Sequence, residues 1–251
     1  MDNRNNIYFA SDFHLGLKGA TDPAKREKRV VNWLDSIAGD AKTIFLLGDI
    51  FDFWWEYKNV VPKGFTRFLG KISELTDSGV EIHFFTGNHD MWIGDYLKEE
   101  CGMILHTDPL ITSINNKVFH IAHGEGLGSN DQFYKILLWI FRNKFIRQLY
   151  AMLHPRWGIG LAHWWSLNSR LTKNYSEEFK GPDNENLFRY AREVLEKQDI
   201  DYFIFGHRHI ALDHEIGKKS RIFFLGNWFN SPAYIKLRDQ DIELIRITSS
   251  H

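Results

Sequence analysis

The sequence predicts an α/β fold arranged as a layered α/β/β/α sandwich, interrupted by a helical insertion over about residues 130–180. Two observations predict the sandwich: strand and helix patterns alternate in the first third of the chain, and strand patterns dominate again near its end. A third observation, a sharp change in charge and aromatic content, marks the insertion. The 251 residues contain no internal repeat and no Pro/Ser-rich linker, so we expect one domain over 1–251.

The first third of the chain reads as β-α-β-α-β. Strands are expected at 7–11, 43–47 and 81–86, because each is a β-rich apolar run that ends in polar residues. Helices are expected at 23–38 and 64–78, where apolar residues recur at helical spacing. These apolar residues are Val30, Trp33, Leu34 and Ile37 in the first helix and Phe65, Phe68, Leu69, Ile72 and Leu75 in the second.

Strand patterns supply the rest of the sandwich. They cover 117–122, 202–205, 221–225, 234–237 and 242–247. The last two flank Arg238-Asp239-Gln240-Asp241, which predicts a hairpin turn.

Residues 132–176 differ in composition from the rest of the chain. They hold seven basic residues, ten aromatic residues and no acid, which leaves a net charge of −8 on the remainder. One apolar helical stripe comprises Leu138, Phe141, Phe145, Leu149 and Met152, and a second comprises Phe133, Ile136, Leu137 and Ile140. A helix with two apolar faces must contact two partners. It could be an ordinary packed insertion with a solvated basic edge, but the absence of acid favours an amphiphilic ligand.

Composition also limits the cellular setting. The single cysteine, Cys101, cannot form an intramolecular disulfide, and the first residues lack the features of a signal peptide, so we expect a cytoplasmic protein. The longest run of apolar residues, 136–141, is far shorter than the roughly 18 needed to cross a bilayer. The near balance of 31 basic and 32 acidic residues does not suggest a nucleic-acid binder.

Five polar clusters follow predicted strands, where α/β sheets place their chemistry. They are Asp12-Phe13-His14, Gly48-Asp49-Ile50-Phe51-Asp52, Gly87-Asn88-His89-Asp90, His123-Gly124 and Gly206-His207-Arg208-His209. Each cluster alone is a weak signal, since a lone histidine or a Gly-Asn-His-Asp turn is commonly structural. Together they supply about eight carboxylate, imidazole and amide donors, which suits two divalent ions that share a bridging carboxylate.

The five blocks, in this order, resemble the signature of the calcineurin-like metallophosphoesterases. The resemblance implies a four-layer metallophosphoesterase sandwich that hydrolyses phosphoesters or phosphoanhydrides. It also implies a first ion on Asp12, His14, Asp49 and His209, and a second ion on Asp49, Asn88, His123 and His207. His89 would face the phosphate as a catalytic residue, with Asp90 or Asp52 orienting its ring. Loop capping is the alternative role for both acids.

At finer scale the chain is similar to the UDP-2,3-diacylglucosamine diphosphatase family of lipid A biosynthesis. The similarity rests on Gly48–Trp54, on His123-Gly124-Glu125 with Asp131 eight residues after the histidine, on the insertion, and on Asn168-Ser169-Arg170. It implies release of UMP and 2,3-diacylglucosamine 1-phosphate, with manganese, by a peripheral protein on the cytoplasmic face of the inner membrane. The implied substrate contacts are Asn88, His89, Asp131, Ser169, Arg170, Lys173 and His207.

One departure and several alternatives remain at this point. Well-known members of that family carry arginine where this chain has His89, which affects the expected substrate but not the metal site. A related phosphodiesterase acting on another nucleotide or a phospholipid would use the same metals. A nuclease is disfavoured because the charge of −8 outside the insertion would repel a duplex. A scaffold without catalysis is disfavoured by the complete ligand set, and no obligate protein partner is evident from the sequence.

Overall fold

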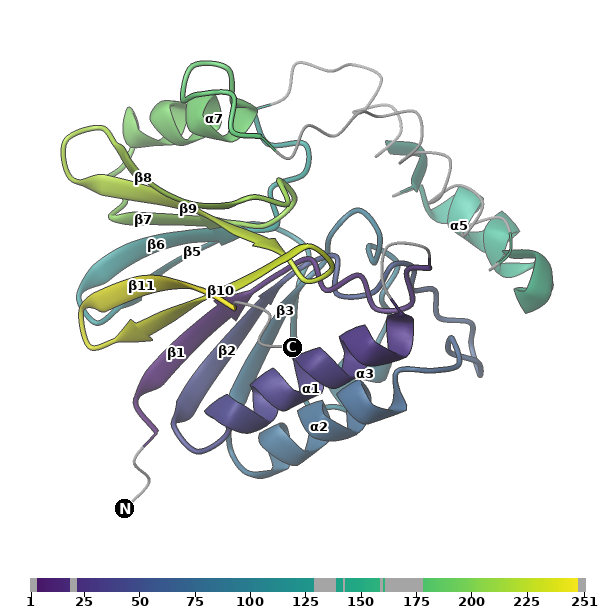
Figure 1. Cartoon of the computed structure of the whole chain (residues 1–251). Coiled ribbons are helices and arrows are strands. Elements are labelled where there is room, and N and C mark those ends of the chain that lie inside the picture. The colour runs from purple at the N-terminus through teal and green to yellow at the C-terminus, as the bar shows by residue number, and fades with distance from the viewer. Residues whose placement is uncertain are drawn as a thin grey trace.

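The computed structural model describes residues 4–18, 22–128, 139–141, 143–158, 160 and 178–247. Within these ranges it forms two β-sheets that face each other, with helices on the outer face of each (Figure 1). The predicted layered α/β/β/α sandwich is confirmed.

The first sheet carries the N-terminal part of the chain. Its strands are β1 (Asn6–Ala10), β2 (Ala41–Leu47), β3 (Glu81–Phe85), β4 (Ile104–His106), β10 (Ser231–Arg238) and β11 (Asp241–Arg246). They lie in the order β4-β3-β2-β1-β10-β11. Strands β1 to β4 run parallel to one another, and β10 pairs antiparallel with β1. The carboxyl ends of β1, β2 and β3 therefore meet at one edge of this sheet.

The second sheet contains β5 (Leu110–Ile114), β6 (Lys117–Ala122), β7 (Tyr202–Phe205), β8 (Ala211–Ile216) and β9 (Ser220–Asn227). Its order is β8-β9-β7-β6-β5, and β6, β7 and β9 run parallel. The two sheets are joined where β9 pairs briefly with β10, at Asn227↔Ser231 and Gly226↔Pro232.

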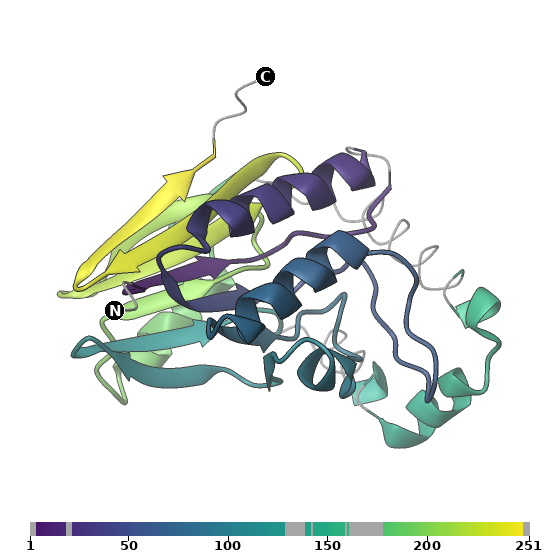
Figure 2. The same cartoon turned by 90° about the horizontal axis from the view of Figure 1, so that it is seen from below.

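Three apolar clusters hold the layers together. Helices α1 (Pro23–Ile37) and α2 (Thr66–Asp77) pack side by side on the first sheet (Figures 1 and 2) and bury Val30, Leu34 and Phe68. Helix α7 (Asn186–Leu195) covers the second sheet through Leu187 and Phe188. Between the sheets lies a third cluster of apolar side chains from both. The start of α1 follows from local chemistry, because the Asp22 carboxylate accepts a hydrogen bond from the Ala24 N–H.

Part of the insertion lies within the described residues. Asn143 caps the N-terminus of helix α5 (Lys144–Ala151), because its side chain accepts hydrogen bonds from the Phe145 and Ile146 N–H groups. A short helix, α3 (Tyr96–Glu99), precedes β4. Across the described ranges, no helix combines the length and apolar character needed to span a membrane.

Candidate metal centre

Residues from both sheets gather at the carboxyl ends of the strands. Asp12 and His14 follow β1, and the other candidate ligands follow β2, β3, β6 and β7. Five of them have a positive φ, which is uncommon for residues other than glycine: Asp12, His14, Asp49, His207 and His209. Clustering of this backbone conformation is typical of functional sites, where it directs side chains toward one point.

Two glycines allow the ligand loops to approach one another. A Cβ atom on Gly87 would lie 2.3 Å from Asp49 Oδ1, and one on Gly206 would lie 2.8 Å from Asp12 Oδ2. Neither contact is possible sterically, so only glycine permits these approaches. The glycines before Asn88 and His207 in the sequence motifs therefore have a direct structural role.

A first group of ligand atoms comes from Asp12, His14, Asp49 and His209. Asp12 Oδ1 lies 3.2 Å from His209 Nε2 and 3.8 Å from His14 Nε2. His14 Nε2 is also 3.8 Å from Asp49 Oδ2. The Asp12 side chain is further fixed because its Oδ2 accepts a hydrogen bond from the His207 N–H.

A second group comes from Asp49, His123 and His207. His123 Nδ1 donates to the Leu47 carbonyl at 2.6 Å, which leaves Nε2 facing Asp49 Oδ2 at 3.5 Å. A bond from the other ring nitrogen to a carbonyl is the usual way in which a protein orients a histidine ligand. Asp49 belongs to both groups, as expected for a bridging carboxylate.

Buried polar atoms without a partner show that the site suits a cation. Asp12 Oδ1, Asn88 Oδ1 and His123 Nε2 are buried, and none makes a hydrogen bond of good geometry among the described residues. Asp12 Oδ1 and His123 Nε2 instead face other candidate ligands, His209 Nε2 at 3.2 Å and Asp49 Oδ2 at 3.5 Å. An unpaired buried polar atom is costly, and three at one place need a common explanation. All three have lone pairs suited to a divalent ion, so the residues present fit a metal centre.

The pKa shifts favour metal ligation by His14, His207 and Asp49, whereas a proton competes with a metal for His123. Burial lowers the pKa of His14 to about 4 and that of His207 to about 3, so both imidazoles are neutral at neutral pH. Burial also opposes ionisation of Asp49, but the neighbouring imidazoles of His123 and His89 outweigh it and hold the pKa of Asp49 well below its usual range. The Asp49 carboxylate in turn overcomes the burial of His123 and raises the pKa of that imidazole well above its usual value.

His89 lies beside the first group, and Asp52 is the acid next to it. His89 Nδ1 donates to the Asp52 carbonyl at 3.0 Å and lies 3.8 Å from Asp52 Oδ1. Asp90 has different contacts: its carboxylate accepts backbone N–H bonds from Gly87, Asp49, Ile50 and Phe51. Of the two acids expected behind His89, the structure therefore places Asp52 at the ring, while Asp90 ties the loops after β2 and β3 together.

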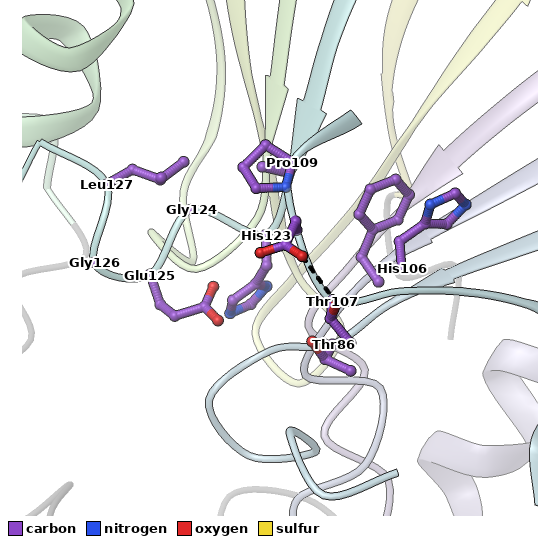
Figure 3. A pocket seen from close by; sticks show the side chains of 12 residues that line it. Thr86, His106, Thr107, Pro109, His123, Gly124, Glu125, Gly126 and Leu127 are labelled. Atoms are coloured by element: carbon purple, nitrogen blue, oxygen red, sulfur yellow. Dashed lines mark hydrogen bonds between the residues drawn. The ribbon is translucent and has the colours of Figure 1, made fainter. Parts of the chain in front are cut away.

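A pocket of about 220 Å³ lies beside His123. It is bounded by residues 124–127, which follow β6, and by Thr86 and Thr107, which follow β3 and β4 (Figure 3). One member of the second ligand group, His123, thus lines this open space.

Comparisons with known proteins agree with this geometry. Residues 6–211 match the calcineurin-like phosphoesterase family. The chain is 43% identical to "UDP-2,3-diacylglucosamine hydrolase" of Porphyromonas gingivalis, over 92% of this chain and 93% of that protein. It is 31% identical to a protein of the same name from Neisseria meningitidis, over 93% of this chain and 94% of that protein.

The chain belongs to the calcineurin-like phosphoesterase family. The ligand cluster and this membership identify a metal-dependent hydrolase that binds divalent metal. Of the predicted site residues, this calcineurin-like phosphoesterase brings together Asp12, His14, Asp49, His89, His123, His207 and His209. Asn88 lies between Gly87 and His89, both of which approach Asp49. Asp131, Ser169, Arg170 and Lys173 lie outside the described residues, and their substrate contacts stay predictions.

Sequence reasoning missed two residues that support the phosphoesterase centre. Arg26 is buried and donates to the His14 carbonyl at 2.6 Å. Asn227 donates to the His209 carbonyl at 2.9 Å. A signal for Arg26 was present, because it lies on the same face of its helix as Val30 and Trp33, where a buried arginine needs a partner.

Proposed function

We propose that the chain hydrolyses the pyrophosphate of UDP-2,3-diacylglucosamine to UMP and 2,3-diacylglucosamine 1-phosphate at a site for two divalent ions, with manganese as the native metal. The observation that carries this proposal is the 43% identity to a UDP-2,3-diacylglucosamine hydrolase over nearly the whole chain. The converging ligand groups support the hydrolytic part of the proposal.

In this proposal each ion has its own ligand set. Asp12, His14, Asp49 and His209 would hold the first ion, and Asp49, Asn88, His123 and His207 the second. Two ions at such a site supply an activated water and neutralise charge that develops on the phosphate oxygens.

The chain's own residues then orient the substrate and move the proton. His89 Nδ1 is committed to the Asp52 carbonyl, so Nε2 is the nitrogen left to face the phosphate. When protonated, Nε2 would donate a hydrogen bond or a proton to a phosphate oxygen. Asn88 and His207, besides their roles as ligands, would contact the same phosphate. Asp90 would act indirectly, by holding the loops that carry Asp49 and Asn88.

The insertion would select the lipid part of the substrate. Asp131, Ser169, Arg170 and Lys173 would contact the sugar and phosphate. In the described part of the insertion, Phe141 and Tyr150 pack against Trp92 with ring centroids 5.1 and 5.8 Å apart. This aromatic contact ties the insertion to the loop that follows His89 and Asp90.

The outer face of the insertion supports peripheral binding to an anionic membrane surface. Three residues of the predicted apolar stripe, Phe145, Leu149 and Met152, are 66%, 51% and 81% exposed. Trp139, Leu153 and Trp157 add to this exposed apolar set. Residues 139–160 include Lys144, Arg147 and Arg156 and no acid. Apolar side chains flanked by cations match the interface of a bilayer that carries negative lipids.

A substrate series tests the catalytic proposal. We expect manganese-loaded protein to cleave UDP-2,3-diacylglucosamine with a kcat/KM at least about 100-fold above that for UDP-N-acetylglucosamine, because acyl contacts position the pyrophosphate. Detection of UMP by chromatography measures both reactions. Equal rates on the two substrates would contradict recognition of the acyl chains. Cleavage of other nucleotide diesters alone would mean that the substrate is a different phosphodiester.

Vesicle binding tests the membrane proposal. Phe145→Asp should reduce cosedimentation with vesicles containing anionic phospholipid by about tenfold, because it puts a charge into the apolar contact. Ile111→Asp is the matched control, since Ile111 is 44% exposed on β5, outside the insertion. If both variants bind as the wild type does, this face is not the membrane contact.

A further inference from the structure

Arg208 lies between two candidate ligands, His207 and His209, and makes a paired contact with Glu185. Arg208 Nε donates to Glu185 Oε2 at 2.7 Å, and Nη2 donates to Oε1 at 2.8 Å. The two side chains are only 16% and 4% exposed. A bidentate arginine-carboxylate pair with so little solvent contact is geometrically specific, and lysine cannot reproduce it.

Glu185 lies shortly after the end of the insertion. It immediately precedes α7, and its carbonyl accepts the first hydrogen bonds of that helix, from the Phe188 and Arg189 N–H groups. Aspartate at this position commonly caps a helix with its side chain, whereas glutamate is not among the preferred capping residues. Here the carboxylate makes no such cap and instead accepts from Arg208 and from the Lys180 N–H.

The backbone conformation of the loop that carries Arg208 must be held by contacts with other parts of the protein. His207 and His209 both have a positive φ, at 63° and 58°. Such a backbone persists only when its surroundings hold it. The His207 N–H donates to Asp12 Oδ2, and Asn227 binds the His209 carbonyl. The pair with Glu185 adds a restraint that comes from α7.

The other end of the insertion also contacts the start of α7. A Cβ atom on Gly128 would lie 2.4 Å from the Asn186 carbonyl oxygen, and one on Gly124 would lie 3.3 Å from Leu187 Cδ1. Residues 124–128 directly follow the candidate ligand His123. The first turn of α7 therefore touches the chain on both sides of the insertion and, through Arg208, the loop with two ligands.

We propose that Arg208 is a positioning residue which, through Glu185, holds His207 and His209 in ligand geometry and links them to both ends of the insertion. This inference rests on the proposed function only in taking these histidines as metal ligands. Arg208 itself touches neither metal nor substrate in this proposal. Its loss should therefore weaken metal binding without removing a ligand.

Metal affinity is the deciding measurement. In Arg208→Lys and Glu185→Gln, we expect the Mn²⁺ affinity of the weaker site to fall by about tenfold, since the bidentate geometry is lost. At limiting metal kcat should fall, and excess Mn²⁺ should restore it with KM little changed. Arg221→Lys is the matched control, because Arg221 also makes a two-bond contact, to Asp213 on β8.

The outcomes separate this inference from the proposed function. Wild-type Mn²⁺ affinity in both folded variants would overturn the positioning role, as would an equal loss in Arg221→Lys. The pairing itself is tested with Arg208→Ala, Glu185→Ala and the double alanine variant. The double variant should bind Mn²⁺ no more weakly than the weaker of the two single alanine variants, and additive losses would contradict the pairing. If wild-type protein binds Mn²⁺ but does not cleave UDP-2,3-diacylglucosamine, the substrate is wrong and the affinity comparison still decides the role of Arg208.

Discussion

At the scale of single residues, His89 is the residue whose loss should lower catalysis without lowering metal binding. Its ring bonds to Asp52, and it is not needed in either proposed ligand set. We therefore expect His89→Ala to keep its full metal content while kcat falls by about 10²- to 10⁴-fold, the usual effect of losing an acid or electrostatic donor. Metal analysis beside steady-state kinetics checks this. A loss of bound metal together with activity would make His89 a ligand.

His120 gives a residue-scale prediction outside the metal centre. Burial lowers its pKa to about 4, and its Nε2 lies 3.0 Å from the Tyr190 hydroxyl. As pH falls through about 6.5 the unfolded chain takes up this proton first, so folding loses stability until the folded pKa is reached. His120→Phe should remove up to about 3 kcal/mol of that loss between pH 6.5 and 4. Denaturant unfolding at several pH values measures it, and an unchanged pH slope would contradict it.

The sequence predicted the site residues better than their partners. The candidate ligands that the structure groups could be selected because glycine, carboxylate and imidazole recur in ordered blocks after strands. The choice between Asp52 and Asp90 could not be made, since it depends on the backbone N–H groups that converge on the Asp90 carboxylate and on the Asp52 carbonyl that accepts from the His89 ring. The Arg208–Glu185 pair joins residues 23 positions apart, and no sequence spacing indicates such a contact.

At the scale of elements, several helices and strands were predicted well, but the ten-residue helix α7 and strands β4, β5 and β8 were missed. Helix α1 and strands β6 and β7 were predicted to within a residue, because their apolar spacing is regular. Strand β4 has only three residues, and β8 mixes acids and histidine with apolar residues, so neither forms a clear pattern. These strands depend on pairing with β3 and β9 rather than on local preference.

For the insertion helix, the structure shows which part of the predicted apolar stripe is packed. Within the predicted stripe, Phe145, Leu149 and Met152 are exposed, whereas Phe141 packs on Trp92. Tyr150, outside the stripe, packs on Trp55 with ring centroids 4.4 Å apart. Periodicity identifies apolar faces but not which face finds a partner. Here the aromatic residues of the loops after β2 and β3 determine which face of the helix is packed. Trp92 Nε1 also donates a hydrogen bond to the Phe141 carbonyl.

Trp92 therefore provides a test of how the insertion is held. Trp92→Ala removes ring contacts to Trp55, Phe141 and Tyr150 and one hydrogen bond. Hydrogen exchange over residues 143–158 should rise at least about tenfold while exchange in β1 and β2 stays unchanged, because the contact lies outside the sandwich core. Unchanged exchange in α5 would show that these rings do not hold the helix.

At the scale of the whole molecule, the site joins the two sheets. Asp12, Asp49 and Asn88 come from the first sheet, and His123, His207 and His209 come from the second. A metal that binds only the folded chain should stabilise it, by about 2.7 kcal/mol at 100 times its Kd. Because a proton competes for His123, whose pKa is raised, this gain should shrink as pH falls. Thermal unfolding with and without chelator at two pH values measures both effects.

The most direct test of the account is UMP release from UDP-2,3-diacylglucosamine by manganese-loaded protein, compared with Asp49→Ala at the same protein concentration. Asp49 contributes to both ligand groups, so its loss removes a ligand from each proposed ion. We predict stoichiometric UMP and diacylglucosamine 1-phosphate from the wild type, two bound metal ions, and a rate at least about 10⁴-fold lower in the variant. Absence of UMP from a metal-loaded wild type, or an active Asp49→Ala that retains two metals, would contradict the account.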